Sequence, residues 1–376
     1  MLEGGREPLT KVRISGGGRC NVTHACFDPE ALAAYYPRGG RELRGAFHRW
    51  QPRDTVAWFE ARGIRLKTEA DGRMFPVTDT SATIVDGLLG AMKDAGVVLA
   101  CNQRVVDIRP RTEGGWTLFM KDGGVRNAAR VMLAVGGLRQ SGLIPVLERL
   151  GHRIAPLAPS LFTFNIADIR LKDLAGVSVP SAVVRLEQPK LEQTGPVLIT
   201  HWGLSGPGIL KLSSKAARDL AEMDYRFTVR VSWLGEQSRP QVETALDVLK
   251  QDNPKRKIVN TPLAPLPQRL WQRLVEAAGV APDQVWAHLG KTERQRLAEE
   301  LADGRYPVSG KSTNKEEFVT CGGVVLKEVD WRTMESRVVP GLHFAGECLD
   351  LDGLTGGFNF QAAWTTGYLA GQAMAG

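Results

Sequence analysis

Apolar residues recur at helical spacing in two stretches of the N-terminal part of the chain. Between Thr80 and Ala95 they lie three and four residues apart, which predicts a helix that Gly96 ends. The segment from Asp54 to Arg62 shows the same spacing, with Asp54 as the expected N-cap. Both segments therefore predict amphipathic helices that cover a core.

Strand patterns follow these helices. Two β-branched bursts in Val97–Arg109 predict a strand pair or one interrupted strand. The residues Trp116–Lys121 and those from Val125 onward flank Asp122-Gly123-Gly124, which predicts a hairpin. The nearly continuous apolar run Arg130–Val135 is typical of a parallel strand buried on both faces. Helices alternating with such strands indicate an α/β fold.

The composition changes after Leu157. Short strands are expected within 161–186 and 226–233, and amphipathic helices are expected at 241–249, 267–278 and 292–301. Apolar strands return from Val324 to Ala345, and the final apolar helix is expected at Gly357–Ala373. This order predicts one domain built from residues 1–157 and 319–376. The predicted inserted domain, 158–318, has β-strands and a helical part at about 240–305.

Composition narrows the class of protein. The 376 residues give room for two or three domains of about 150 residues each. No apolar run approaches the roughly 18 residues of a membrane span, and the N-terminus lacks the order of a secretory signal. We expect a cytoplasmic protein without a membrane partner.

Neither the cysteines nor the histidines follow a metal or disulfide pattern. The five cysteines include no CxxC pair, and the six histidines form no HExxH motif or Cys/His ladder. We expect reduced thiols and no metal site.

The formal net charge of +7 allows an anionic partner, either a nucleic acid or a phosphorylated cofactor. The densest basic run is short, Lys255-Arg256-Lys257, and no nucleic-acid-binding motif accompanies it. We therefore expect a solvated basic surface and a small-molecule substrate, with nucleic acid as the disfavoured partner.

Two glycine clusters suggest ligand contacts. In Gly341–Glu347 a strand ends in glycine and acid, and Thr355–Gln361 opens the last helix with Gly356-Gly357. A carboxylate can accept hydrogen bonds from sugar hydroxyls, and the free N–H groups of a helix N-terminus favour anions. A flavin nucleotide carries both groups, although an ordinary strand-to-helix turn can show the same glycines. The cluster Ser15–Asn21 predicts a loop lying close to a ligand or another backbone.

Five segments together resemble the FAD-binding oxidoreductase family that includes aminoacetone oxidase-like and BaiN-like proteins. These segments are Lys11–Asn21, Gly72–Val77, Val319–Val324, Thr333–Ser336 and Ala345–Gln361. The resemblance spans nearly the whole chain. It implies a Rossmann-like, two-dinucleotide-binding flavoprotein domain with an inserted β-barrel plus helical bundle. It also implies FAD as cofactor, with NAD(P)H as the candidate electron donor.

One departure from this family lies at the N-terminus. Its members open with a strand, a GxGxxG turn and a helix that hold the FAD pyrophosphate. Here Leu2-Glu3 resembles the end of the following strand, so Glu3 corresponds to the ribose-binding acid. We expect that roughly thirty preceding residues are missing from this sequence. The alternative to a working oxidoreductase is a truncated, inactive remnant that binds flavin poorly or not at all.

The resemblance also implies the residues of the site. Glu347 would accept hydrogen bonds from the flavin ribityl chain, and Gly356–Asn359 would line the pyrimidine edge of the ring. The implied cofactor-binding residues are Glu3, Lys11, Ser15, Gly16, Gly17, Gly18, Arg19, Cys20, Asn21, Val105, Ala134, Gly136, Gly137, Gly346, Glu347, Gly356, Gly357, Phe358 and Asn359. Core packing is the rival explanation for Val105 and Ala134.

No acid–base pair identifies the catalytic residues. The pocket candidates, chosen because their motifs flank the expected flavin, are Arg73, Thr320, Cys321 and Asn359. Cys321 is also typical of a small packing residue, and Trp202 either covers the pocket or packs within the inserted domain. The expected reaction is hydride transfer through the flavin, either in amine oxidation or in reduction of an activated C=C bond, and both remain open.

Overall fold

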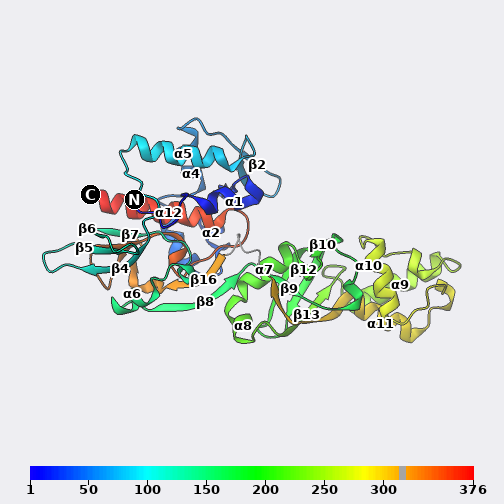
Figure 1. Ribbon diagram of the computed structural model, residues 1–376. Coiled ribbons are helices and arrows are strands. Elements are labelled where there is room, and N and C mark those ends of the chain that lie inside the picture. The colour runs from blue at the N-terminus through cyan, green and yellow to red at the C-terminus, as the bar shows by residue number, and fades with distance from the viewer. Residues whose placement is uncertain (313–318) are drawn as a thin grey trace. The chain divides into compact units, whose positions relative to one another are not determined.

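The computed structural model describes residues 1–312 and 319–376 and contains two compact units (Figure 1). Unit 1 comprises Met1–Ala158 with Lys315–Gly376, and unit 2 comprises Pro159–Asn314. The second boundary expected from the sequence, after residue 318, lies outside the described residues. Unit 1 is thus built from two separate stretches of the chain.

Among the described residues, unit 1 has three helices that the sequence predicted, at 54–62, 80–95 and 357–373, and four that it did not. The helices are α1 (Thr10–Gly18), α2 (Pro29–Ala33), α3 (Gly40–Phe47), α4 (Pro52–Glu60), α5 (Ser81–Asp94), α6 (Ile144–Arg149) and α12 (Phe358–Ala375), with the short 3₁₀ turns η1 (Leu138–Gln140), η5 (Leu326–Glu328) and η6 (Gly346–Cys348). Helix α5 is confirmed within a residue of its predicted ends, with Thr80 as N-cap and Gly96 in the left-handed region. The predicted role of Asp54 is wrong. Gln51 is the N-cap of α4, and Asp54 lies at N3, where its carboxylate accepts the Gln51 N–H at 2.8 Å.

Four small sheets support these helices. Their strand orders are β1-β3-β2, β4-β5-β6, β16-β8 and β17-β18-β19-β7. The strands are β1 (Thr23–His24), β2 (Leu66–Thr68), β3 (Arg73–Pro76), β4 (Val105–Pro110), β5 (Trp116–Met120), β6 (Val125–Ala128), β7 (Val131–Leu133), β8 (Ile154–Ser160), β16 (Val319–Val324), β17 (Val329–Asp330), β18 (Glu335–Ser336) and β19 (Leu342–Phe344). The predicted hairpin is confirmed as β5 and β6, joined across Asp122–Gly124.

Two strand predictions need correction. Strand β7 pairs in parallel with β19, as predicted, but it is not buried on both faces, because the side chain of Met132 is 39% exposed. The apolar run could not show that β7 is an edge strand of its sheet. Of Val97–Arg109, only the part from Val105 onward forms a strand. Ala100 makes an isolated parallel bridge with Leu2.

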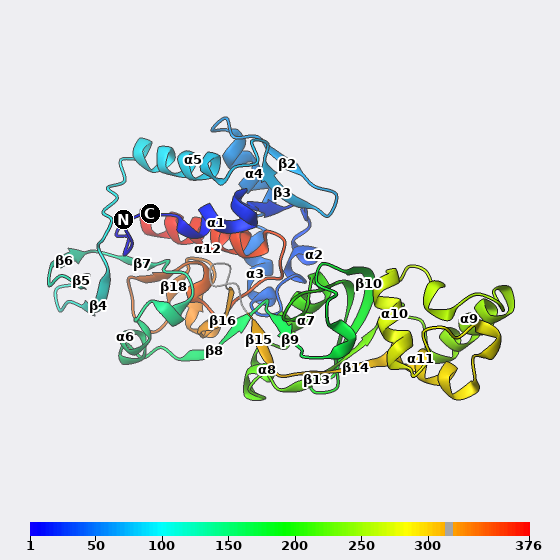
Figure 2. The same cartoon turned by 45° about the vertical axis from the view of Figure 1, so that its right-hand side comes forward.

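Helix α12 lies against β19, β1, α3 and α4, which places it at the centre of unit 1 (Figure 2). Its buried face includes Ala362, Leu369 and Ala370. Three polar residues, Gln361, Thr365 and Thr366, are buried with them. The Gln361 Oε1 atom accepts hydrogen bonds from Thr23 Oγ1 at 2.6 Å and Thr55 Oγ1 at 3.1 Å. These bonds satisfy the buried amide oxygen and tie α12 to β1 and α4.

Unit 2 contains one seven-stranded sheet with the order β14-β13-β10-β11-β12-β9-β15. Its strands are β9 (Thr163–Asn165), β10 (Ser178–Leu186), β11 (Leu191–Ile199), β12 (Gly203–Ser205), β13 (Phe227–Ser232), β14 (Gly304–Val308) and β15 (Gly310–Ser312). Strands β14 and β15 lie at opposite edges of this order, yet only Ser309 separates them in sequence. The sheet must therefore curl until its edges meet, which produces the expected barrel.

Helices of unit 2 gather in two places. Helices α7 (Pro207–Lys215) and α8 (Ala217–Glu222) accompany the strands, while α9 (Arg239–Asp252), α10 (Gln268–Ala277) and α11 (Lys291–Asp303) form a bundle at one end of the unit (Figures 1 and 2). The 3₁₀ turns of the unit are η2 (Ile169–Leu171), η3 (Ile258–Asn260) and η4 (Trp286–His288). The three bundle helices confirm the sequence prediction. Helix α7 and strand β11 were not predicted.

Candidate functional site

Glycine-rich segments from opposite ends of the sequence meet in unit 1. The Lys11 ammonium, on α1, forms an ion pair with the Glu347 carboxylate, on η6. The end of β7 reaches the same place, because a Cβ built on Gly136 would lie 3.3 Å from Lys11 Nζ and 3.7 Å from Glu347 Oε2. Lys11, Gly136 and Glu347, which the sequence predicted as site residues, thus lie close together although they come from distant segments of the chain.

The loop after α1 has the conformation that its glycines predict. Ser15 has an extended ψ of 149°, and Gly16, Gly17 and Gly18 all have positive φ, so the helix is interrupted although its assigned range extends to Gly18. A bond from Cys20 N–H to Ser15 C=O, 3.0 Å long, closes the turn. No atom lies within 4 Å of a Cβ built on Gly17 or Gly18. These glycines are therefore required by backbone conformation and not by crowding.

Asn21 connects this loop to the start of α12. With its amide turned so that both ends find a partner, the side-chain oxygen accepts the Gly357 N–H at 2.9 Å and the side-chain nitrogen donates to Thr23 C=O at 3.0 Å. Gly357 has a φ of 94°, and a Cβ there would lie 2.5 Å from the Thr23 carbonyl oxygen. Gly357 has no side chain that could cap α12, so the N–H groups that follow it in the first turn remain available for an anionic or carbonyl ligand.

Thr320 belongs to the same group of residues. A Cβ on Gly137 would lie 2.7 Å from Thr320 Oγ1, so the turn after β7 and strand β16 are in close contact. Its neighbour Cys321 is fully buried, which supports the packing interpretation for that thiol. Gly346, with a φ of 71°, donates its N–H to Thr366 Oγ1 at 2.9 Å, which fixes the turn that carries Glu347.

Arg19 and Arg73 are already engaged by carboxylates. Glu69 accepts from Arg19 at 2.7 Å and from Arg73 at 2.9 Å, and Asp71 accepts from Arg73 at 2.8 Å. Both guanidinium groups also lie over the Phe75 ring, 4.0 and 5.4 Å from its centroid. To bind a ligand as predicted, these arginines would therefore have to break their hydrogen bonds to Glu69 and Asp71.

The side chains of Phe358 and Asn359 contact other residues of unit 1. The Phe358 ring is 2% exposed and stacks on Tyr35 and His24, with centroids 4.2 and 4.6 Å apart. The Asn359 amide accepts from Gly353 N–H at 2.8 Å and donates to Gly353 C=O at 2.9 Å. Both side chains have partners within the fold, which leaves the backbone N–H groups of these residues for the ring contact expected from the sequence.

The remaining predicted residues lie in the N-terminal segment, in β4 and directly after β7. The Glu3 carboxylate accepts the Gly5 N–H at 2.6 Å, and the Glu3 N–H donates to Ala100 C=O at 2.9 Å. Val105 begins β4, opposite Met120. Ala134 directly follows β7 and is exposed. Its exposure argues against a purely core role at that position.

Buried thiols near the site are not nucleophiles at neutral pH. Burial raises the pKa of Cys20 to about 11, although a hydrogen bond to Ser15 opposes the shift. Burial likewise raises the pKa of Cys348 to about 12. Because the thiolate is the reactive form, both residues act as small apolar groups here.

A buried ion pair near the site was not predicted. Both oxygens of Asp352 accept hydrogen bonds from the Arg38 guanidinium, and the Asp352 side chain is fully buried. Asp352 precedes the Gly356-Gly357 turn, so the pair anchors the loop that leads to α12. No sequence pattern pointed to this aspartate, because its segment, 349–354, also contains Asp350.

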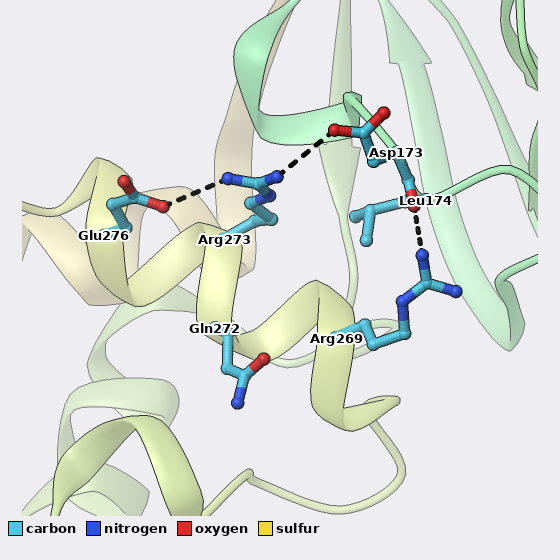
Figure 3. Close-up of a pocket in the computed structure, with 6 residues that line it drawn as sticks. All are labelled: Asp173, Leu174, Arg269, Gln272, Arg273 and Glu276. Carbon is cyan, nitrogen blue, oxygen red and sulfur yellow. Dashed lines mark hydrogen bonds and ion pairs between the residues drawn. The ribbon is translucent and has the colours of Figure 1, made fainter. Parts of the chain in front are cut away.

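Unit 2 contains a separate hollow of about 250 Å³, which is lined mainly by charged side chains (Figure 3). Arg273 lies between Glu276 at 3.4 Å and Asp173 at 3.8 Å, and Arg269 donates to the Asp173 carbonyl. Leu174 and Gln272 complete the lining. Two arginines and two carboxylates balance one another, so the hollow offers no net charge to a charged ligand.

The meeting point in unit 1 fits part of a flavin. It combines a carboxylate that can accept from hydroxyl groups, an ammonium, glycine backbone, and the open first turn of α12. These groups match a ribityl chain and the electron-rich edge of a reduced ring. Within the described ranges, no group of three or more His, Cys, Asp or Glu residues suits a metal ion, and no helix is long and apolar enough to cross a membrane.

Comparison with known proteins gives full-length matches. The chain is 30% identical to the ribosomal RNA dihydrouridine synthase of Escherichia coli (strain K12), covering 99% of this chain and 90% of that protein. It is 28% identical to the 3-dehydro-bile acid delta(4,6)-reductase of Clostridium scindens, covering 97% of this chain and 90% of that protein. Among solved structures, a 3-ketosteroid-delta4-(5alpha)-dehydrogenase from Rhodococcus jostii RHA1 matches with a TM-score of 0.46 and 14% identity, covering 100% of this chain and 87% of that chain.

The family described as HI0933-like protein Rossmann domain matches residues 1–373. This match covers nearly the whole chain and agrees with the α/β architecture of unit 1. The chain therefore belongs to the HI0933-like Rossmann-domain family.

Proposed function

We propose that this protein is an FAD-dependent oxidoreductase that reduces an activated C=C bond, and that its substrate is a uracil base in ribosomal RNA. The observation that carries the flavin assignment is the meeting of Lys11, Gly136 and Glu347 beside the open N-terminus of α12. Bound FAD, once reduced, supplies the hydride.

The names of the relatives favour reduction over amine oxidation. Making dihydrouridine saturates the C5=C6 bond of uracil, which is conjugated to a carbonyl group. The name 3-dehydro-bile acid delta(4,6)-reductase describes reduction of double bonds conjugated to a ring ketone. Both reactions add hydrogen to an electron-poor C=C bond. We therefore favour C=C reduction for this chain.

RNA is favoured over a steroid as the substrate. Two ribosomal RNA dihydrouridine synthases, 30% and 26% identical to this chain, support it. The net charge of +7 also suits a polyanion better than a bile acid. This proposal departs from the sequence-based expectation that nucleic acid is the disfavoured partner.

The chain's own residues have defined tasks in this scheme. The Glu347 carboxylate would accept hydrogen bonds from hydroxyl groups of the cofactor, and the Lys11 ammonium forms an ion pair with that carboxylate. The first-turn N–H groups of α12 stabilise negative charge on the reduced ring. The buried Arg38–Asp352 pair and the Asn359–Gly353 contacts keep this helix start in place.

The test uses the purified full-length protein, ribosomal RNA transcribed in vitro, and NAD(P)H or dithionite as reductant. We expect a yellow protein and the gain of two hydrogens on uridine, measured by mass spectrometry of nucleosides. Glu347→Gln should lower the flavin content per polypeptide, while Glu113→Gln, at an exposed hairpin position, should not.

Three outcomes separate the alternatives. A colourless protein that cannot be reconstituted with FAD would overturn the proposal and support an inactive remnant. A yellow protein that reduces a 3-oxo-4,6-diene steroid but not uridine would keep the flavin chemistry and replace the substrate. Oxidation of amines without either reduction would overturn the reaction type.

A further inference from the structure

The helical bundle of unit 2 presents three consecutive cations on a fixed loop. Lys255, Arg256 and Lys257 lie between α9 and η3, and all three are exposed. Their backbone is held in place by the segment that enters η4. Trp286 N–H donates to Arg256 C=O at 3.0 Å, and Lys257 forms an antiparallel bridge with Val285. We call these three residues the basic ridge.

The apolar side of this loop is anchored inside the bundle. Ile258, which follows the ridge, is fully buried, as are Trp271 and Trp286. The Trp271 indole N–H donates to Ile258 C=O at 2.8 Å. The ridge is therefore held rigidly at its base, and its long side chains extend into solvent. Such a loop loses little backbone entropy when it binds a partner.

Within the described ranges, the ridge cations form no ion pair with a carboxylate. Other arginines of the unit are paired. Arg230 contacts Asp303 at 2.5 Å, and Arg273 contacts Glu276 at 3.4 Å. Figure 3 shows the same neutralisation around the hollow on α10. The positive charge of the ridge is thus left for an external partner.

A structural role at the end of α9 is the rival explanation. Cations near a helix C-terminus stabilise its dipole. Here, however, the terminal carbonyl of Leu249 accepts from Asn253 N–H at 2.9 Å and from the Asn253 side chain at 3.2 Å. Lys250 reaches Leu289 C=O at 2.8 Å. The helix end is closed without the ridge, which lies beyond Asp252.

We propose that the basic ridge binds the phosphate backbone of the RNA substrate. This inference rests on the proposed function, because it assumes that the substrate is RNA. Each phosphate contact releases counterions, with a slope of log affinity against log salt of about −0.7 per contact for single strands. Three contacts give a total slope of about −2, which corresponds to roughly a hundredfold in affinity at about 0.1 M salt.

The test compares two variants of the full-length protein with equal charge loss. One is Lys255→Gln/Arg256→Gln/Lys257→Gln. The control is Lys190→Gln/Arg226→Gln/Lys291→Gln, at exposed cations of unit 2 that form no ion pair among the described residues. A fluorescent fragment of ribosomal RNA transcribed in vitro is the probe, and fluorescence polarisation is measured over a series of salt concentrations.

We expect the ridge variant to lose roughly a hundredfold in affinity at about 0.1 M salt and to flatten the salt slope by about 2. Its flavin content and melting temperature should match those of the control. Equal affinity and slope in the two variants would overturn the proposal. An equal loss of affinity for poly-glutamate would also overturn it, because the ridge would then recognise acidic chains in general.

Failure of the proposed function gives a different result. Wild-type protein that binds RNA through the ridge but forms no dihydrouridine would overturn the proposed reaction and keep the ridge. Wild-type protein that forms dihydrouridine at the same rate as the ridge variant, with equal RNA affinity, would overturn only the ridge.

Discussion

A methyl group at Gly357 tests the tightest contact of the candidate site. A Cβ at this position would lie 2.5 Å from the carbonyl oxygen of Thr23 and 2.6 Å from its carbonyl carbon. These are backbone atoms, so the Asn21–Gly357 turn must shift to admit Gly357→Ala. The left-handed conformation costs an L-residue about 1–2 kcal/mol, and overpacking adds about 1–3 kcal/mol. We expect the free energy of unfolding to fall by about 2–5 kcal/mol.

Gly18→Ala is the matched control. Gly18 also has a positive φ, 83°, but no atom lies within 4 Å of its built Cβ. The substitution therefore carries only the conformational cost of about 1–2 kcal/mol. In scanning calorimetry, a domain of the size of unit 1 loses about 2–4 °C in melting temperature for each kcal/mol. We expect a loss of about 4–20 °C for Gly357→Ala and about 2–8 °C for the control.

Flavin content per polypeptide provides the second readout. Gly357→Ala should release flavin, because the first turn of α12 moves with the glycine. Equal melting temperatures for the two variants would refute the packing of Gly357 on Thr23. Unchanged flavin content in a destabilised Gly357→Ala protein would refute the placement of the cofactor at this helix start.

Three further predictions address the buried groups. Arg38→Met should lower the free energy of unfolding by about 3–5 kcal/mol, because the buried Asp352 carboxylate loses the guanidinium that donates to both of its oxygens, and Arg38→Met/Asp352→Leu should recover most of it in urea titrations. Burial lowers the pKa of His152 despite the nearby Glu328 carboxylate. Below about pH 6.5 His152 therefore binds a proton in the unfolded chain but stays neutral in the folded chain. The free energy of unfolding should fall as the pH drops through that value. His152→Asn should weaken this pH dependence. Burial raises the pKa of Cys348 to about 12, so peptide mapping after iodoacetamide treatment should find no label there before unfolding, and early labelling would contradict its burial.

Elements with a strong local signal were predicted from the sequence. Helix α5 has regular apolar spacing and a glycine stop, and the β5–β6 hairpin has a turn with two glycines. Burial was harder to predict. The apolar run of β7 does not reveal that Met132 is exposed, because burial depends on the elements around a strand and not on its own composition.

For the site, the sequence predicted the positions but not the side-chain roles. The glycine clusters indicated where the backbone turns sharply, and the structure brings Lys11 and Glu347 together there. The contacts that hold the turns were missed. Asn21 binds Gly357, and Asn359 binds Gly353, through amides that could equally well have faced a ligand. Only the folded backbone decides which hydrogen-bond partner a polar side chain reaches.

The discontinuity of unit 1 affects the order in which the protein can fold during synthesis. Strand β7 leaves the ribosome before all of unit 2, whereas its parallel partner β19 emerges after it. Unit 2 has its own core and can fold before β19, the partner strand of β7, has been synthesised. We expect proteolysis of a chain ending at residue 312 to spare a fragment within residues 159–312 and to digest residues 1–158. The cofactor site would then be the last part of the nascent protein to assemble.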